Sequence, residues 1–239
     1  MIEPKQRAGQ CNATMEAMMR STNTARPIVL TLFMLLAVAV KGHQAHAQSV
    51  ETLTVAGGCF WCVESDFESV PGVLSAVSGY TGGNTKSPTY KQVTAGGTGH
   101  YEAVQIRFDP TMVTRKQLLS MFLRSVDPTD ADGQFCDRGD SYRTAIFTSG
   151  ADQTSVAKAA KSEAQSALGQ TIVTPILPAT AFYPAEAYHQ DYYKGRKLVL
   201  TRFGPKRQSE AYKRYRKACG RDARVLQLWG DAAPFAKGH

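Results

Sequence analysis

The sequence predicts an α+β fold: a mixed β-sheet built around a split β-α-β, ferredoxin-like core, with helices packed on it. Strand and helix patterns alternate over residues 52–177. The first six elements follow the order strand, helix, strand, strand, helix, strand, which is the order of this core. The chain has 239 residues, of which 43% are hydrophobic and 20% charged. This composition is sufficient for a packed core and excludes global disorder.

The strands are predicted from alternating apolar residues and from the turns that bound them. The first strand alternates up to a glycine pair, which indicates a tight turn. Val104, Ile106 and Phe108 alternate with polar residues in the third strand. Pro175 interrupts the last strand and indicates a sheet edge. The strands are expected at residues 52–56, 73–78, 103–108, 142–148 and 172–177.

The helices are predicted from apolar residues at helical spacing and from capping residues. Phe60, Val63 and Phe67 recur at i, i+3 and i+7 in the first helix. Thr114 and Gln117 form a capping-box pattern at the start of the second. Residues 183–204 are aromatic and basic and give no clear pattern. The helices are expected at residues 59–69, 114–126, 152–168 and 209–228, with a break allowed at Gly220.

Residues 1–47 have the pattern of a signal peptide. Arg20 and Arg26 precede an apolar run at 28–40, and Ala45-His46-Ala47 is a small-x-small cleavage pattern. The run is shorter than the ~18–20 residues of a membrane span, so we expect cleavage after Ala47 and no stable membrane insertion afterwards. An uncut signal anchor is the alternative. Residues 48–239 would then be a single periplasmic or secreted domain, with translation starting at Met1, Met15, Met18 or Met19.

The charge of the chain is uneven. The sequence has 28 basic and 20 acidic residues, and residues 202–224 hold nine of the basic and two of the acidic ones. A run of this kind is most often the solvated face of a helix, here a basic C-terminal helical tail. It contains no groove-reading motif, so we do not expect nucleic-acid binding.

Signal cleavage would leave four of the five cysteines. An even number in an oxidising compartment is consistent with two structural disulfides. A domain of this length does not need them for stability, however. Cys59 and Cys62 are three positions apart, a spacing typical of redox or metal sites. The four cysteines are Cys59, Cys62, Cys136 and Cys219.

Cys59 follows the glycine pair and begins the first predicted helix. Unpaired backbone N–H groups and the positive end of the helix dipole stabilise a thiolate there. We therefore expect a lowered pKa and a nucleophilic sulfur. Phe60 and Trp61 follow directly and could line an apolar pocket for a small non-polar group. The alternative is an inert cysteine in an aromatic core.

Seven short motifs, in order, resemble the A-type peptide methionine sulfoxide reductases. The resemblance covers roughly residues 52–202, and the ordered set is far more specific than any one motif. The motifs are Gly58-Cys59-Phe60-Trp61 with Glu64, Gly79-Tyr80-Thr81-Gly82-Gly83, Pro88-Thr89-Tyr90, Gly99-His100-Tyr101-Glu102-Ala103-Val104, Asp137-Arg138-Gly139, Tyr142-Arg143 and Tyr188-His189-Gln190-Asp191-Tyr192.

The resemblance implies a site with no cofactor and no metal. The family reduces the S epimer of methionine sulfoxide, free or in proteins, through a cysteine sulfenic acid. Sulfoxide oxygen is a poor leaving group, so it needs an acid whose pKa is raised by burial. The implied roles are Cys59 as nucleophile, Glu102 as acid, Tyr90 and Tyr142 as donors to the sulfoxide oxygen, Asp137 as their support, and Phe60 and Trp61 as the methyl pocket.

Three cysteines are candidates for resolving the sulfenic acid. Cys62, where many family members have Gly, lies one helical turn from Cys59 and is the first choice. Cys219 lies in the C-terminal region, where the family often carries its resolving cysteine. Cys136 precedes Asp137, at a position that the family often fills with Asn. Thioredoxin, or a membrane-relayed thioredoxin-like protein if the enzyme is exported, would then reduce the intramolecular disulfide.

Other functions remain open at this point. A general thiol–disulfide oxidoreductase would use Cys59 and Cys62 but has no need of the motifs around Glu102 and Asp137. A zinc module needs a second pair of ligands, and the sequence offers none at the usual spacing. An exported binding protein would need none of these motifs. We expect His189 to be a packing residue and not a base.

Overall fold

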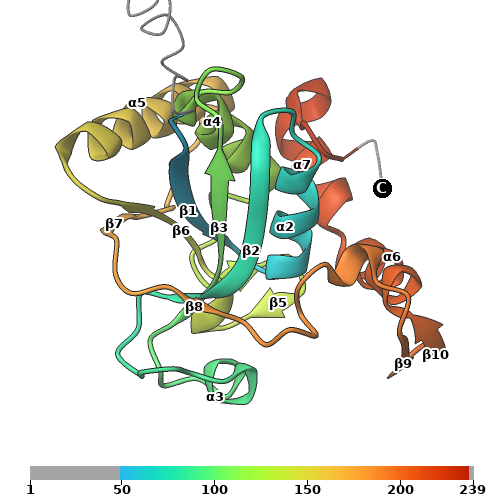
Figure 1. Cartoon of the computed structure of the whole chain (residues 1–239). Helices are drawn as coiled ribbons and strands as arrows, with labels where there is room; N and C mark the ends of the chain where they lie inside the picture. Colours follow the sequence, from blue (N-terminus) through green and yellow to red (C-terminus); the bar gives the residue numbers. More distant parts are fainter. Residues whose placement is uncertain (1–48, 237–239) are drawn as a thin grey trace, which may run out of the picture. The chain divides into compact units, whose positions relative to one another are not determined.

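A six-stranded mixed sheet forms the centre of the fold (Figure 1). The computed structural model describes residues 49–236, so the predicted signal segment lies outside the described residues. All neighbouring strands are antiparallel except the pair β6–β7. The strand order is β7 (Ile176–Pro178), β6 (Thr144–Thr148), β1 (Glu51–Gly57), β3 (Tyr101–Phe108), β2 (Val73–Thr81) and β8 (Tyr183–Pro184).

The split β-α-β core is confirmed. β3 lies between β1 and β2 and is antiparallel to both: Val104 pairs with Val55 on one side and with Ser78 on the other. Helix α2 (Phe60–Glu68) connects β1 to β2, and α4 (Arg115–Ser125) connects β3 to β6. This arrangement places the N-terminus of α2 and the start of β3 at the same end of the sheet.

The main core lies between one face of the sheet and the helices. Leu53 and Ile106 from the sheet pack against Phe67 of α2 and Phe122 of α4, all fully buried. Burying a side chain of this size contributes about 1.5–3 kcal/mol. Helix α5 (Ala151–Leu168) adds a row of alanines to this core. A smaller cluster around Phe147 covers the opposite face.

Three elements differ from the sequence prediction. Tyr142 does not begin a strand: it ends the 3₁₀ helix η1 (Asp140–Tyr142), after Gly139 turns the chain with φ 109°, and β6 starts at Thr144. The edge strand is shorter than predicted and begins beyond Pro175, which cannot donate to the ladder. Helix α3 (Tyr90–Thr94) was missed, although its first residues form a capping box that could have indicated it.

The C-terminal region contains two helices and a hairpin. Helix α6 (Gln208–Cys219) ends at Gly220, whose φ is 77°, and α7 (Arg221–Trp229) follows, so the predicted break is confirmed. Strands β9 (Leu198–Thr201) and β10 (Gly204–Arg207) form the hairpin, which lies beside α6 (Figure 1). The remaining short elements are β4 (Gly133–Gln134), β5 (Asp137–Arg138), η2 (Tyr192–Lys194) and η3 (Gly230–Ala232).

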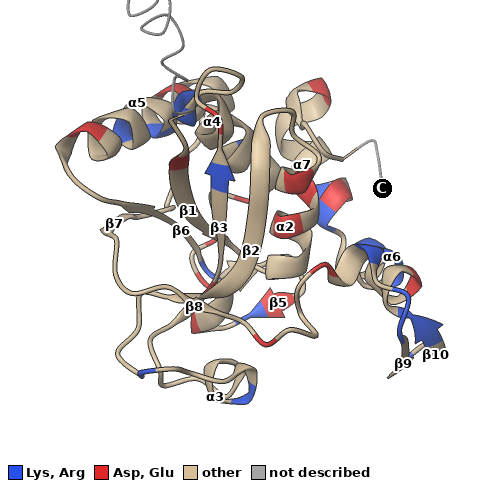
Figure 2. Ribbon diagram, in the orientation of Figure 1, with Lys and Arg blue, Asp and Glu red and all other residues tan. Residues whose placement is uncertain are grey.

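The basic run is only partly a solvated face. Most of its Lys and Arg residues are exposed along β10 and α6 (Figure 2). Arg216 and Arg221 are buried, at 3% and 2% exposure. The prediction of a solvated face is therefore wrong at these two positions, where the guanidinium groups bind partners inside the protein. No helix in the described part of the chain is long and apolar enough to cross a membrane.

Candidate active site

A cavity of about 330 Å³ opens at the N-terminus of α2. All the predicted site residues line it, although they come from segments spread over residues 59–219. The ten are Cys59, Phe60, Trp61, Cys62, Tyr90, Glu102, Cys136, Asp137, Tyr142 and Cys219. The fold therefore brings together every side chain for which the sequence indicated a role.

The glycine pair positions Cys59. Gly58 has φ 77°, and a Cβ added there would lie 2.6 Å from Cβ of Gln134. Only glycine meets both conditions without displacing its neighbours. The turn makes Cys59 the N-cap residue of α2, with its side chain half-buried at the cavity.

Glu102 is buried at the start of β3, with 2% exposure. Its Oε2 accepts the backbone N–H of Phe60 at 3.1 Å, which fixes the carboxyl beside the N-terminus of α2. Burial raises the pKa of Glu102 to about 8, and the bond from Phe60 offsets this only in part. The carboxyl is thus protonated at pH 7, as expected for a proton donor.

The prediction that the pKa of Cys59 is lowered is wrong. The thiols of Cys59 and Cys62 share a hydrogen bond, which, with burial, raises the pKa of Cys59. The same bond lowers the pKa of Cys62 to about 7. The first free N–H of α2, on Phe60, is taken by Glu102 and cannot stabilise a Cys59 thiolate. The pair therefore carries a negative charge in about half of the molecules at pH 7, and proton transfer between the sulfurs would place this charge on Cys59.

Two buried arginines that sequence analysis missed stabilise this charge. Arg221 and Arg216 line the cavity, and both lower the pKa of Cys62. Arg221 donates to the backbone oxygens of Ser125 and Gly57, and Arg216 forms ion pairs at 2.7 Å with Asp66 and Asp222. The only sequence signal was their place in the basic run, which does not separate buried from exposed arginines.

Tyr90 and Tyr142 face the same space as Glu102. Their hydroxyls are hydrogen-bonded to each other, and burial raises the pKa of both. They therefore stay protonated and serve as neutral donors over the whole physiological range. Burial also raises the pKa of Asp137, against the opposing effect of Arg221.

Trp61 is held on two sides. Its ring stacks on Tyr192, with centroids 3.8 Å apart and planes 4° apart. Its indole N–H donates to Nδ1 of His189 at 3.1 Å. Burial lowers the pKa of His189 to about 4, so the imidazole is neutral and can accept this bond. His189 is thus a packing and positioning residue. Phe60 stacks on Tyr90, with ring centroids 6.3 Å apart.

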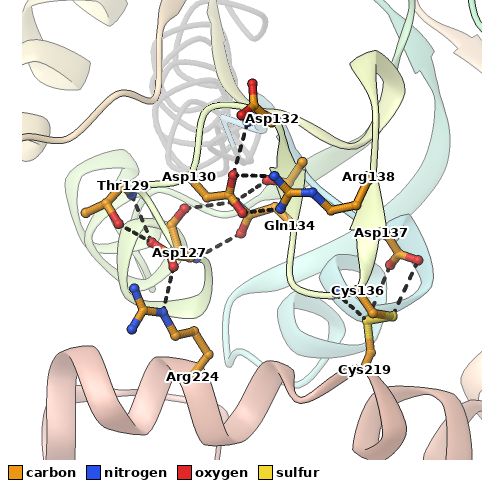
Figure 3. A network of polar contacts seen from close by, with 11 residues as sticks. Asp127, Thr129, Asp130, Asp132, Gln134, Cys136, Asp137, Arg138, Cys219 and Arg224 are labelled. Atoms are coloured by element: carbon orange, nitrogen blue, oxygen red, sulfur yellow. Dashed lines mark hydrogen bonds and ion pairs between the residues drawn. A yellow bond between two sulfur atoms is a disulfide. The ribbon is translucent and has the colours of Figure 1, made fainter.

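Cys136 and Cys219 form a disulfide at the cavity wall, while Cys59 and Cys62 are free thiols. Cys136 and Asp137 belong to a loop that polar contacts hold in place (Figure 3). The amide of Gln134 accepts from the backbone of Asp127 and donates back to it, both at 2.8 Å. Arg224 of α7 binds Asp127 at 2.7 Å. The loop and the C-terminal helices therefore form one wall.

A buried neutral acid, two adjacent cysteines and an aromatic pocket define a thiol-dependent oxidoreductase. The sequence model of a family described as peptide methionine sulfoxide reductase matches residues 51–222. The chain belongs to this family, in its A type, whose members are oxidoreductases acting on sulfur groups and reduce methionine sulfoxide.

Two relatives are similar in sequence to this chain along most of its length. It is 47% identical over 206 residues to the peptide methionine sulfoxide reductase MsrA 2 of Caulobacter vibrioides, which covers 86% of this chain and 98% of that protein. The reductase MsrA 2 of Rhizobium meliloti is 46% identical over 211 residues, with 88% and 96% covered.

Solved structures support the fold. The reduced form of Mxr1 from Saccharomyces cerevisiae superposes with a TM-score of 0.58 and 33% identity, over 62% of this chain and 86% of that one. Methionine sulfoxide reductase A of Corynebacterium diphtheriae gives a TM-score of 0.55 and 33% identity, over 65% and 79%.

Proposed function

We propose that the protein reduces methionine-(S)-sulfoxide, with Cys59 as nucleophile and Glu102 as general acid. One observation carries these roles: a carboxyl that burial keeps protonated is bonded to the backbone of the residue after Cys59, at 3.1 Å. A sulfoxide sulfur beside Cys59 would therefore have its oxygen near a proton donor. Tyr90 and Tyr142 would hold that oxygen, Asp137 would support them, and Phe60 and Trp61 would enclose the methyl group.

The chemistry balances without a cofactor. The thiolate of Cys59 attacks the sulfoxide sulfur while Glu102 protonates the oxygen, so that a bond forms between the two sulfurs. The hydroxyl then transfers to the sulfur of Cys59 as the S–O and S–S bonds of the methionine sulfur break. Methionine leaves, and Cys59 is left as a sulfenic acid. A second thiol then condenses with it to form a disulfide and water. Two electrons from an external dithiol restore both thiols.

Cys62 is the proposed resolving cysteine. Its thiol is hydrogen-bonded to Cys59, and its pKa of about 7 keeps a substantial fraction ionised at neutral pH. Cys136 and Cys219 are joined to each other, so neither offers a free thiol until that bond is reduced. Cys62 is therefore placed ahead of Cys219 as the resolving cysteine.

Export and a thioredoxin-like reductant complete the proposal. The signal pattern in residues 1–47 supports a periplasmic or secreted location, and removal after Ala47 would leave Gln48 as the first residue. Thioredoxin-like proteins reduce disulfides of this kind, and an exported enzyme needs one on its own side of the membrane. Free methionine sulfoxide and oxidised proteins are both substrates under this proposal.

The test is epimer-resolved kinetics with dithiothreitol as reductant. We expect reduction of N-acetyl-methionine-(S)-sulfoxide with little activity on the R epimer. A pocket that places the methyl group and the oxygen on fixed sides of Cys59 accepts only one epimer at the sulfoxide sulfur. Equal rates on both epimers, or none on either, would refute the assignment.

A further inference from the structure

The hairpin of β9 and β10 carries two of the most exposed large apolar side chains in the described part of the chain. Leu198 is 68% exposed and Leu200 is 85% exposed. They lie at i and i+2 on β9 and so point to the same side of the strand. Leu200 also lines the rim of the active-site cavity. An apolar strip thus extends outward from the place where chemistry would occur.

The backbone of β9 has a free edge along this strip. Among the strands of residues 49–236, β9 pairs only with β10, in a two-stranded sheet. Leu200 is opposite Pro205, which has no N–H, so this pair occupies a position without ladder hydrogen bonds. Leu198 occupies the equivalent position two residues earlier. The N–H and C=O groups of both leucines therefore point away from β10.

The two edges of the hairpin differ in their protection. The β10 edge has Pro205, Lys206 and Arg207, residues that prevent edge-to-edge pairing. The β9 edge consists of Leu198–Thr201 and has no such residue. An unprotected apolar edge is the template that extended peptides bind by adding a strand.

Basic residues around the apolar strip of Leu198 and Leu200 favour peptides with acidic side chains. Residues 196–207 contain five basic and no acidic residues. Figure 2 shows basic residues on the hairpin and on α6. Acidic side chains near the docked segment would be attracted to it, and salt would weaken that attraction.

We propose that the free edge of β9 docks an extended, unfolded polypeptide that carries methionine sulfoxide flanked by apolar and acidic residues. The cavity, at about 330 Å³, is of a size that takes a small molecule and not an extended polypeptide, so the rest of such a substrate must lie across its rim. Leu198 and Leu200 contact the apolar neighbours, and the backbone of β9 pairs with the peptide. This inference rests on the proposed function and specifies its substrate as oxidised, unfolded protein.

The experiment compares two substrates with dithiothreitol as reductant. One is N-acetyl-methionine-(S)-sulfoxide, and the other is a capped pentapeptide with Glu and Leu on each side of the same residue. In Leu198→Ser we expect kcat/KM for the peptide to fall about fivefold, mainly through KM, which corresponds to about 1 kcal/mol. The small substrate should change less than twofold. Leu200→Ser, at the rim, should lower peptide reduction at least as much.

Leu74→Ser is the matched control, because Leu74 is 50% exposed on β2 and does not line the cavity. It should change neither substrate. Methylation of alternate peptide amides should lower kcat/KM of the wild type by a similar factor, since those amides would pair with β9. Replacing Glu by Lys in the peptide should also lower it, and 0.5 M salt should reduce the difference.

Several outcomes would overturn the docking strip while leaving the reductase activity intact. One is an equal loss on both substrates in Leu198→Ser; another is no loss on either. A third is an unchanged peptide KM with a raised KM for a thioredoxin-like reductant, which would assign the strip to the reductant. A concentration-dependent dimer that Leu198→Ser abolishes would assign it to a second copy of the chain. If the wild type reduces neither substrate, the proposed function fails and the inference fails with it.

Discussion

The pH dependence of the reaction should have two limbs, and replacing Glu102 by Gln should remove one of them. Attack needs the thiolate of the cysteine pair, whose pKa is about 7 at Cys62. Protonation of the sulfoxide oxygen needs the acid form of Glu102, whose pKa is about 8. The rate should therefore rise through about pH 7 and fall through about pH 8.

The magnitudes follow from these two values. At pH 7.5 about 58% of the molecules have both groups in the required form, and at pH 6 or pH 9 only about 9% do. kcat/KM should thus fall about sixfold on either side of the maximum. Glu102→Gln keeps the shape but has no proton to give, so the loss at the maximum should be about 10²–10⁴-fold.

The same substitution should stabilise the protein at high pH. The pKa of Glu102 is about 8 in the folded protein and about 4.3 in an unfolded chain, so ionisation opposes folding. The contribution of the neutral Glu102 carboxyl to the free energy of unfolding is fully present below about pH 4.3. It is lost as the pH rises through about 8, and the loss is about 5 kcal/mol at most. The Gln variant has no such loss. Its Tm should exceed that of the wild type at pH 9 and be similar to it at pH 5.

The assay is dithiothreitol-driven reduction of N-acetyl-methionine-(S)-sulfoxide between pH 5.5 and 9.5, with thermal unfolding on the same samples. The reasoning is refuted if the variant loses less than about threefold in activity, or if it keeps the alkaline limb near pH 8. Glu64→Gln is the matched control. Burial also raises the pKa of that glutamate, to about 7. It contacts Ser78 and the backbone of Asp191, away from the cavity lining. Its pH–rate profile should keep both limbs.

The remaining predictions concern the cysteines, the buried arginines and export. The Cys62→Ser variant should complete one turnover, but its rate of repeated turnover with a thioredoxin-like reductant should be lower than that of the wild type, and dithiothreitol should partly rescue it. Cys219→Ser should show the smaller defect. The reverse ranking would make Cys219 the resolving residue. Arg221→Gln should move the rise of the pH–rate profile above pH 7, because Arg221 lowers the pKa of Cys62, whereas Arg221→Lys should leave it near pH 7. The rate of alkylation by iodoacetamide, measured against pH, reports this shift. Equal alkylation profiles for the wild type and Arg221→Gln would exclude the electrostatic role of Arg221. N-terminal sequencing of the protein from its native cell should begin at Gln48, and full-length protein in the cytoplasm would contradict export.

The sequence was sufficient for the sheet and for the residues around Cys59 because both depend on local patterns. Alternation and helical spacing gave five of the six strands of the main sheet and all the α-helices of the described residues except α3. The ordered motifs gave seven of the predicted cavity residues and the cysteine positions gave the other three, although Cys59 and Glu102 are 43 residues apart in sequence. β3 returns beside β1 and so brings Glu102 to the N-terminus of α2.

The features of the site that could not be predicted from the sequence depend on contacts between distant segments. Arg216 reaches Asp66 across 150 residues, and nothing in the basic run distinguishes it from its exposed neighbours. The Cys136–Cys219 disulfide likewise follows from where the loop meets the end of α6, since four cysteines allow three pairings. The pKa of Cys59 was predicted wrongly because the helix N-terminus was considered without the hydrogen bond that the Cys59 thiol donates to Cys62.

The most direct test of the mechanism is a single turnover without reductant. Wild-type protein mixed with excess N-acetyl-methionine-(S)-sulfoxide should form about one equivalent of N-acetyl-methionine. Peptide mass spectrometry should then find Cys59 in a disulfide, with Cys62 as its partner. Cys59→Ser should form no product, because a hydroxyl is not ionised near neutral pH. Product formation by Cys59→Ser, or an unmodified Cys59 thiol after one equivalent of product, would contradict the account.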